Sequence, residues 1–436
     1  MNGKFYHSVY LDEEKCVGCY NCLKRCPTKA IRIENGKSRI ISEYCTDCGE
    51  CIRFCKNGAK RVQYDSFERI HDYEYTVALP TPSLYAQFNH LDDISIVLTA
   101  LVLLGFNEVF EVSTAAELVS DATRKYVKAN PDKWPVISSA CPSVVRLIRV
   151  KYPNLLENLS PIPAPMEVAA EIARKRAMAK TGLASDKIGI FYISSCPAKV
   201  AAVKSPLGME KSNIDHVLGM KKMYPRLLSV MNKASENPLE FSLAGRIGVG
   251  WGVTGGEAAG SFNDSYIIAD GMENVVQVLN DLEDDKFQTQ VKFIELNACN
   301  GGCVGGALTV ENPFVASTKL KTLYRYLPVS VYHEVDYPEE LQLARPKPIE
   351  YEPVYELGST ILESMENMQR ADDLLNHLPG LDCGLCGCPS CKTHAMDVVM
   401  GRTGMDKCVF LNKNSIRDWK AEHREAASGE KDKDEG

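Results

Sequence analysis

No stretch of this chain is apolar for long enough to cross a lipid bilayer. The longest apolar segment, residues 94–104, contains Ser95 and Thr99, whereas a membrane-spanning helix needs about 20 predominantly apolar residues. The first ten residues lack the apolar core of a secretory signal. Excess positive charge is also missing, because the formal net charge is -7. These absences argue against membrane, secreted and nucleic-acid-binding proteins.

Isolated cysteines are absent too, since all 17 cysteines fall into four groups. Their C-x2-C spacings are those of metal ligands, and an odd total would leave one thiol unpaired in a disulfide scheme. We therefore expect a cytoplasmic, anaerobic protein that handles electrons through iron–sulfur clusters. The 436 residues, 45% of them hydrophobic and 25% charged, are enough for two to four globular domains.

Two C-x2-C-x2-C-x3-C runs lie in the first predicted domain, residues 4–66. Between them, the alternating residues 30–34 and the turn Asn35-Gly36 predict a hairpin. The runs are typical of two-cluster ferredoxins, in which the fourth cysteine of each run binds the other cluster. Zinc sites are the weaker alternative, since zinc ribbons use C-x2-C pairs. The predicted ligand sets are Cys16, Cys19, Cys22 and Cys55 for one [4Fe–4S] cluster, and Cys45, Cys48, Cys51 and Cys26 for the other.

Residues 70–343 alternate between short apolar strands and helices, which predicts an α/β domain with parallel sheets. Cys141, Cys196 and the pair Cys299 and Cys303 each follow a predicted strand closely. Functional groups of such sheets gather beyond the carboxyl ends of the strands, so we expect these sulfurs to converge. The predicted strands are residues 75–79, 135–137, 188–193, 246–249 and 293–296, and the predicted helices are residues 91–104, 166–179 and 275–282.

The motifs around these four cysteines resemble those of [FeFe] hydrogenases. Ser-Ser-Ala-Cys-Pro (138–142), Ser-Ser-Cys-Pro-Ala-Lys (194–199) and the glycine-rich 295–306 are similar to the family's T-S-C-C-P, M-P-C-x-x-K and E-x-M-A-C-x-x-G-C-x-x-G-G. The resemblance, over about residues 73–333, implies a two-lobed domain with a six-iron H-cluster. It also implies that Lys199 and Cys303 are catalytic, with Lys199 donating to a cyanide ligand. The [4Fe–4S] ligands that it implies are Cys141, Cys196, Cys299 and Cys303, with Cys303 bridging to a [2Fe] unit that carries CO, CN and a dithiolate amine.

The chain departs from the family pattern at positions next to this cofactor. Ala140 stands where typical members have the cysteine that passes protons, and Asn297 stands at a methionine position. Loss of one proton-transfer group slows turnover on the order of 10² to 10⁴-fold. The departures imply the divergent, sensory branch of the family. Residues 248–256 are glycine-rich but lack the GxGxxG register, so they predict a loop against the active site.

Five further cysteines lie in the predicted domain 361–424, after a proline-rich linker at 344–360. This domain resembles the small [4Fe–4S] domain of corrinoid iron–sulfur proteins. Zinc is the alternative occupant, Cys388 is a spare thiol or an alternate ligand, and His394 is expected on the helix surface. A charged tail, 425–436, is expected to be disordered. The implied cluster ligands are Cys383, Cys386, Cys391 and Cys408.

The resemblances imply reversible interconversion of dihydrogen with protons and electrons, at a low rate that suits sensing of H2 or redox state. The implied partners are hydrogenase maturation proteins and a redox protein such as ferredoxin or a downstream signalling protein. Two alternatives remain. One is a non-catalytic iron–sulfur protein resembling the eukaryotic hydrogenase-like assembly factors, without the [2Fe] unit, and the other is an electron-transfer adaptor for a larger enzyme.

Overall fold

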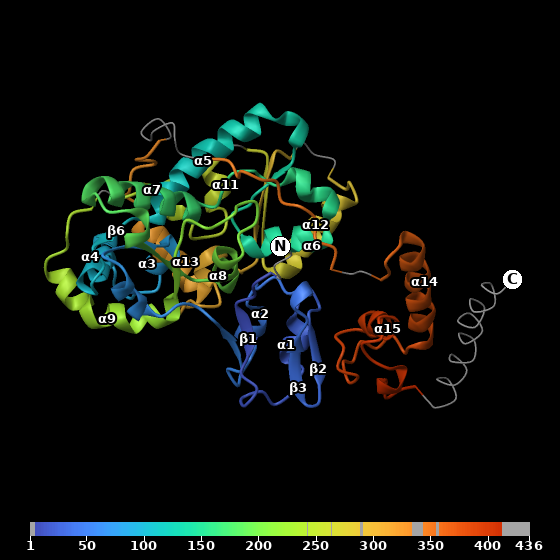
Figure 1. The fold of residues 1–436 in the computed structure, drawn as a ribbon. Coiled ribbons are helices and arrows are strands. Elements are labelled where there is room, and N and C mark those ends of the chain that lie inside the picture. The colour runs from blue at the N-terminus through green and yellow to red at the C-terminus, as the bar shows by residue number, and fades with distance from the viewer. Residues whose placement is uncertain are drawn as a thin grey trace. The chain divides into compact units, whose positions relative to one another are not determined.

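The chain divides into two compact units, each described here by itself. The computed structural model describes residues 5–241, 243–262, 264–287, 291–333, 343–354 and 357–411 (Figure 1). The tail expected at 425–436 lies outside the described residues. The predicted ferredoxin domain 4–66 is divided between the units, which differs from the expected boundary. The larger unit comprises Met1–Tyr10, Thr46–Gly49 and Val62–Glu352, and the smaller unit comprises Leu11–Cys45, Glu50–Arg61 and Pro353–Gly436.

The larger unit contains a four-stranded sheet whose neighbouring strands are all parallel. Its order is β6-β5-β8-β9. All seven residues of β8 are buried, as expected for a strand that is covered on both faces. The strands predicted at residues 75–79 and 188–193 are therefore present. The four strands are β5 (Tyr75–Pro80), β6 (Glu108–Val109), β8 (Ile188–Ser194) and β9 (His216–Gly219).

Helices cover both faces of this sheet (Figure 1). Since side chains alternate along a strand, Ala78 and Phe191 pack with α4 and α9, whereas Val77 and Tyr192 pack with α5 and α7. The two cores hold the sheet rigidly and fix the positions of its strand ends. The four helices are α4 (Ile94–Leu103), α5 (Val112–Ala129), α7 (Pro165–Thr181) and α9 (Met220–Glu236).

A second, three-stranded parallel sheet of order β10-β11-β7 forms the other lobe of the larger unit. Ile137 and Ile294 pack against α6 and α12, which cover one of its faces. The expected two-lobed α/β domain with parallel sheets is thus confirmed. The elements of this lobe are β7 (Val136–Ile137), β10 (Tyr266–Asp270), β11 (Phe293–Asn297), α6 (Pro142–Lys151) and α12 (Met272–Glu283).

The strand predicted at residues 246–249 is wrong, because this segment forms helix α10 (Arg246–Gly250). The buried Glu117 accepts a hydrogen bond from the backbone of Gly245, with Oε1 to N at 2.7 Å. A Cβ on Gly248 would collide with the carbonyl oxygen of Ser113, so α10 packs backbone against backbone on α5. A five-residue segment is too short to show the hydrophobic period of a helix or a strand, so tertiary packing determines its conformation.

The smaller unit contains the predicted hairpin, formed by β2 (Ile31–Glu34) and β3 (Lys37–Ile40). No helix in the described part of the chain is both long and apolar enough to span a membrane. The α-helices of the smaller unit are α1 (Asn21–Arg25), α2 (Glu50–Arg53), α14 (Ile361–His377) and α15 (Cys391–Val399). The remaining strands and α-helices among the described residues are β1 (Val9–Leu11), β4 (Lys60–Val62), α3 (Pro82–Tyr85), α8 (Pro197–Lys204), α11 (Gly256–Gly260) and α13 (Pro313–Leu323).

The segment expected as a linker, residues 344–360, is partly packed onto the larger unit. The backbone N–H of Arg345 donates to Pro161, at 2.8 Å, and that of Glu352 donates to Arg149, at 3.1 Å. The backbone N–H groups of Arg345 and Glu352 are therefore both hydrogen-bonded to the preceding domain. Thr360 then caps α14 by accepting from the N–H of Glu363, at 3.1 Å. The first part of the expected linker, residues 344–352, is therefore part of the larger unit.

Candidate functional site

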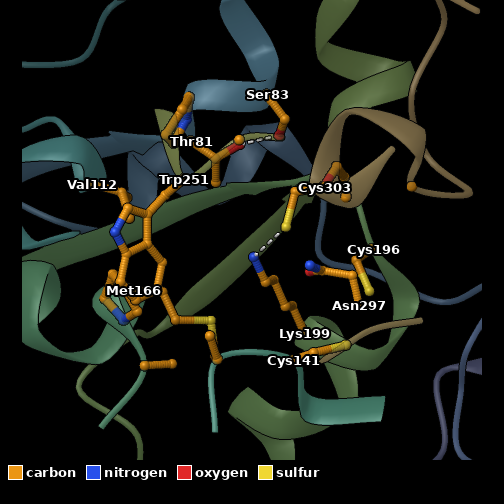
Figure 2. Close-up of a pocket in the computed structure, with 18 of the residues that line it drawn as sticks. Thr81, Ser83, Val112, Cys141, Met166, Cys196, Lys199, Trp251, Asn297 and Cys303 are labelled. Atoms are coloured by element: carbon orange, nitrogen blue, oxygen red, sulfur yellow. Dashed lines mark hydrogen bonds between the residues drawn. The ribbon is translucent and has the colours of Figure 1, made fainter. Parts of the chain in front are cut away.

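A pocket of about 840 Å³ in the larger unit collects every residue expected to contact the cofactor (Figure 2). Its walls come from the loops that follow β5, β7, β8 and β11, at the carboxyl ends of both sheets. This is the position where parallel α/β folds place their ligands. The expected residues that line the pocket are Ala140, Cys141, Cys196, Lys199, Asn297, Cys299 and Cys303.

Cys141 and Cys196 occupy the same structural position in the two lobes. Each follows a strand and is the N-cap of a helix whose first residue is proline, at Pro142 of α6 and Pro197 of α8. Proline is favoured there because its fixed φ suits the first helical turn and its missing N–H is not needed. The positive end of each helix dipole therefore faces a cysteine sulfur, which stabilises the negative charge of a bound thiolate.

The other two cysteines lie on a tight glycine-rich loop after β11. The N–H of Gly302 donates to the carbonyl of Cys299 at 3.0 Å, and its φ of 82° is one that glycine tolerates. A Cβ on Gly306 would collide with the carbonyl oxygen of Ser195, in the loop after β8. Glycine therefore lets the Cys303 loop approach the backbone beside Cys196.

The spacing of the four pocket sulfurs favours a cluster over a single zinc ion. Tetrahedral zinc, with Zn–S bonds of about 2.3 Å, holds its sulfurs about 3.8 Å apart. Two groups of three ligand atoms lie within 4.8 Å of one another in the described part of the chain, and neither contains Cys141, Cys196, Cys299 or Cys303. The four cysteines therefore do not form a compact site for a single ion.

Lys199 extends into the pocket from α8 and donates to the sulfur of Cys303, with Nζ to Sγ at 3.5 Å (Figure 2). Figure 2 shows the cysteines on one side of this side chain and Trp251 with Met166 on the other. Burial lowers the pKa of Lys199, but the charges of Cys303 and other neighbours outweigh it and hold the pKa well above its ordinary value. A buried ammonium needs anionic partners, and the sulfur of Cys303 is positioned to be one of them when it binds metal.

A carboxyl group that the sequence reasoning missed lies beside Ala140. Ser138 donates to Oε2 of Glu257 at 2.6 Å, and the backbone N–H of Ala140 donates to Oγ of Ser138 at 3.2 Å. Burial, together with the nearby Glu295, raises the pKa of Glu257 to about 8. The raised pKa favours the protonated form of the Glu257 carboxyl. The sequence signal was the Thr-Gly-Gly-Glu at 254–257, directly after the glycine-rich segment.

Glu295 has a structural role in the wall of the same pocket. It accepts from the backbone N–H groups of Gly255 and Ala258, both at 2.8 Å, and from Nδ2 of Asn297 at 2.7 Å. Its two oxygens thus fix the loop before α11 and hold the Asn297 amide. The expectation that residues 248–256 form a loop is wrong for residues 248–250, which belong to α10, but Trp251 and Gly252 of this segment do line the pocket.

One further polar atom tests whether this pocket suits a bound cofactor. The hydroxyl of Ser195 is buried and has no hydrogen-bond partner within the described ranges of the chain. Unsatisfied buried polar groups cost free energy, and Ser195 lines the pocket. A cofactor with acceptor or donor atoms at this wall would satisfy it. The residues present therefore fit an H-cluster.

Two of the N-terminal cysteines have matching environments in the smaller unit. The sulfur of Cys26 accepts from the N–H of Ala30, and that of Cys55 accepts from the N–H of Ala59, both at 3.2 Å. N–H···S bonds of this kind stabilise cluster-bound thiolates. The repeat agrees with the internal duplication of the two runs. Seven of the eight cysteines belong to the smaller unit and Cys48 belongs to the larger one.

The C-terminal cysteines line a separate pocket of about 320 Å³. His394, which we expected on the surface, lines it too and is only 1% exposed. Its Nδ1 lies 3.7 Å from the sulfur of Cys388, and its Nε2 has no partner among the described residues. Hydrogen bonding with Cys388 lowers the pKa of Cys386, against the effect of burial, and His394 acts in the same direction as Cys388. The cysteines that line this pocket are Cys383, Cys386, Cys388, Cys391 and Cys408.

Comparisons with known proteins find related iron hydrogenases. Iron hydrogenase 1 of Clostridium pasteurianum is 24% identical over 258 residues, which is 48% of this chain and 44% of the relative. The chain thus spans less than half the length of that relative. The periplasmic [Fe] hydrogenase large subunit of Nitratidesulfovibrio vulgaris is 24% identical over 382 residues, or 73% of this chain and 90% of the relative.

A solved [FeFe]-hydrogenase from Chlamydomonas reinhardtii, in a variant form, superposes with a TM-score of 0.47 at 14% identity, covering 63% of this chain and 94% of that one. A 4Fe-4S dicluster domain model matches residues 8–56. An Fe-S cluster domain model matches residues 378–410. The model described as iron only hydrogenase large subunit, C-terminal domain, matches residues 74–261 and 253–307, more than half of the chain. The chain therefore belongs to the iron-only hydrogenase large-subunit family.

Proposed function

We propose that this protein interconverts dihydrogen with protons and electrons at an H-cluster, slowly, and that it uses this reaction to sense H2 or redox state. One observation carries the proposal: Cys141, Cys196, Cys299 and Cys303, which are far apart in the sequence, line one pocket. When bound, an H-cluster supplies the iron at which dihydrogen is formed or split. The four cysteines would hold its [4Fe–4S] part, and Cys303 would bridge to the [2Fe] unit.

Lys199 supplies the positive charge of the pocket. Its Nζ already lies 3.5 Å from the sulfur of Cys303, the residue that would join the two parts of the cofactor. From there it would donate to a cyanide ligand of the [2Fe] unit. This interaction orients the cofactor and offsets its negative charge, which a buried anion requires.

The site lacks the proton-transfer cysteine that typical family members have at the position of Ala140. The methyl group of Ala140 neither gives nor accepts a proton, so the next ionisable group is Glu257, hydrogen-bonded to Ser138 at 2.6 Å. A proton leaving the pocket must pass by this pair or by water. General acid–base groups in position contribute 10² to 10⁴-fold in rate, so this arrangement supports slow turnover.

Electrons would reach the pocket through accessory [4Fe–4S] clusters, two in the N-terminal runs and one in the C-terminal domain. For the C-terminal cluster we assign Cys383, Cys386, Cys391 and Cys408 as ligands. The buried Nε2 of His394, which lines the same pocket without a partner, would donate a hydrogen bond to that cluster. The external partners are H2, protons, maturation proteins and a redox protein such as ferredoxin or a downstream signalling protein.

Infrared spectroscopy of the matured protein tests the proposal. Metal-bound carbonyl and cyanide give bands in a spectral window where the polypeptide does not absorb. We expect these bands in the native chain and their loss in Cys303→Ser, which keeps the size of the side chain but removes the bridging thiolate. Native protein without these bands, but with normal iron–sulfur signals, would instead support the non-catalytic electron-transfer alternative, which the absence of a thiol at Ala140 favours.

A further inference from the structure

Within the smaller unit, a buried ion pair joins the C-terminal domain to the ferredoxin hairpin. Arg32 of β2 donates through Nε and Nη2 to the two carboxylate oxygens of Asp397 on α15, with the Nη2–Oδ1 distance at 3.1 Å. Each side chain is only 5% exposed. The same guanidinium donates to the carbonyl of Lys29 at 2.6 Å. Bidentate pairs of this kind fix orientation as well as distance.

The ion pair is continuous with the wall of the C-terminal pocket. The thiol of Cys388 donates to Oδ2 of Asp397 at 3.5 Å and lies next to Nδ1 of His394. Cys388 therefore has a hydrogen-bonding role that does not require it to bind iron. The chain of contacts runs from β2 through Asp397 and Cys388 to the site of the cluster.

The loop that carries the first two C-terminal ligands, Cys383 and Cys386, also packs along α1. The N–H of Ile33 donates to the carbonyl of Gly387 at 2.9 Å, and a Cβ on Gly387 would collide with the Ile33 carbonyl. A Cβ on Gly384 would lie 3.3 Å from Leu23, and Lys24 donates to carbonyl groups of the same loop. Because α1 contains Cys22 and ends directly before Cys26, each N-terminal cluster has one ligand at this contact.

We propose that the C-terminal domain is a docked electron relay, which exchanges single electrons directly with the N-terminal clusters across the contact between its cysteine loop and α1. The reduced C-terminal cluster passes from [4Fe–4S]⁺ to [4Fe–4S]²⁺, and an N-terminal cluster gains that electron in the reverse change. No bond or proton is exchanged. The redox protein of the proposed function supplies or removes the electrons. The inference rests on the proposed function for its iron–sulfur clusters alone.

The alternative is a domain tethered by its linker that visits the ferredoxin module transiently. Surface charge pairs would suit such transient contacts, since they contribute little to stability. The pair formed by Arg32 and Asp397 is buried instead, and removing one partner of such a pair leaves an uncompensated charge. Loss of Arg32 should therefore enlarge the undocked fraction by about a hundredfold or more.

Electron paramagnetic resonance of the full chain tests the relay. The clusters are reconstituted without H-cluster maturation and reduced with dithionite, because two reduced clusters that lie close together show magnetic spin–spin interaction. The two N-terminal clusters also interact with each other, so we expect the native chain to show an additional interaction with the C-terminal cluster. Cys386→Ala, which removes that cluster, should lose this additional interaction. Arg32→Glu should keep the iron content but lose the interaction. Arg39→Glu is the matched control, since Arg39 lies on the same hairpin and is 67% exposed.

The following variants and outcomes complete the test. Exchanging the charges, Arg32→Glu with Asp397→Arg, should restore part of the interaction. Should Arg32→Glu fail to bind its clusters, Asp397→Asn, of nearly equal size, provides the same comparison. Native protein without spin coupling to the C-terminal cluster, or Arg32→Glu and Asp397→Asn with unchanged coupling, overturns the relay. Absence of carbonyl and cyanide bands after maturation removes the proposed function but leaves this measurement unaffected.

Discussion

Replacing Ala140 with cysteine should restore a proton-transfer group to the pocket. Ala140 lines the pocket with Lys199 and Cys303, and its backbone is hydrogen-bonded to Ser138, the partner of Glu257. A thiol at this position would lie between the cofactor site and the Glu257 carboxyl. Restoring one general acid–base group is worth 10² to 10⁴-fold in rate, or roughly 3 to 5 kcal/mol of activation free energy.

The assay is hydrogen evolution by the matured full chain, with reduced methyl viologen as electron donor. Rates are divided by the H-cluster content from infrared absorbance, so that differences in maturation do not count as differences in turnover. Ala140→Ser is the control, because its hydroxyl is similar in size but too weak an acid to serve as the same relay. We expect Ala140→Cys to gain at least about 10²-fold and Ala140→Ser to stay near the native rate.

Equal rates in Ala140→Cys and the native chain would refute the explanation of slow turnover by proton transfer. Equal gains in the cysteine and serine variants would refute it differently, since they would show that bulk or polarity at Ala140 matters and acidity does not. A solvent deuterium isotope effect in the native chain that disappears in Ala140→Cys would support the same step independently.

Three further changes test other parts of the account. Burial raises the pKa of Glu257 above its ordinary value in the folded chain, so the folded state retains a proton that the unfolded state releases, and stability falls as pH rises from the ordinary carboxyl pKa to the raised one. Glu257→Gln should remove this loss, as melting temperatures measured against pH would show. Lys199→Met should shift the cyanide infrared bands and lower the yield of matured H-cluster. Cys388→Ser should keep the C-terminal iron–sulfur signal, whereas Cys386→Ser should lose it; loss in both would make Cys388 a ligand.

Local sequence signals were sufficient to predict the elements that carry the pocket cysteines. A buried strand followed by Cys-Pro needs only nearby residues to form, because proline starts the helix and the strand ends where the apolar run ends. The position of Cys141 and Cys196 at helix N-termini follows from that arrangement. Cys141 and Cys299 lie close because they follow β7 and β11, parallel neighbours in one sheet. Cys196 follows β8 of the other sheet, so its approach to them depends on the packing of the two lobes.

Long-range packing decided what the sequence could not predict. Segment 246–249 is helical because Gly245 and Gly248 meet Glu117 and Ser113 of α5, over a hundred residues earlier. His394 is buried because it lines the C-terminal pocket, where its Nδ1 lies 3.7 Å from the sulfur of Cys388. In both cases the deciding neighbours are distant in sequence or belong to a pocket wall, and helical period alone does not identify them.

Under the proposed function, the departures at the pocket affect proton transfer and leave the four cysteine ligands in place. Asn297 replaces a methionine of the family pattern, yet its amide is held by Glu295, which also fixes Gly255 and Ala258. Ala140 removes a thiol but lies outside the four-cysteine set. Under the proposed function, electrons therefore have a route through several clusters, whereas protons depend on Ser138 and Glu257. Turnover should accordingly respond to changes at Ala140 and Glu257 and be insensitive to the driving force of the electron donor, which is the behaviour that a slow sensor requires.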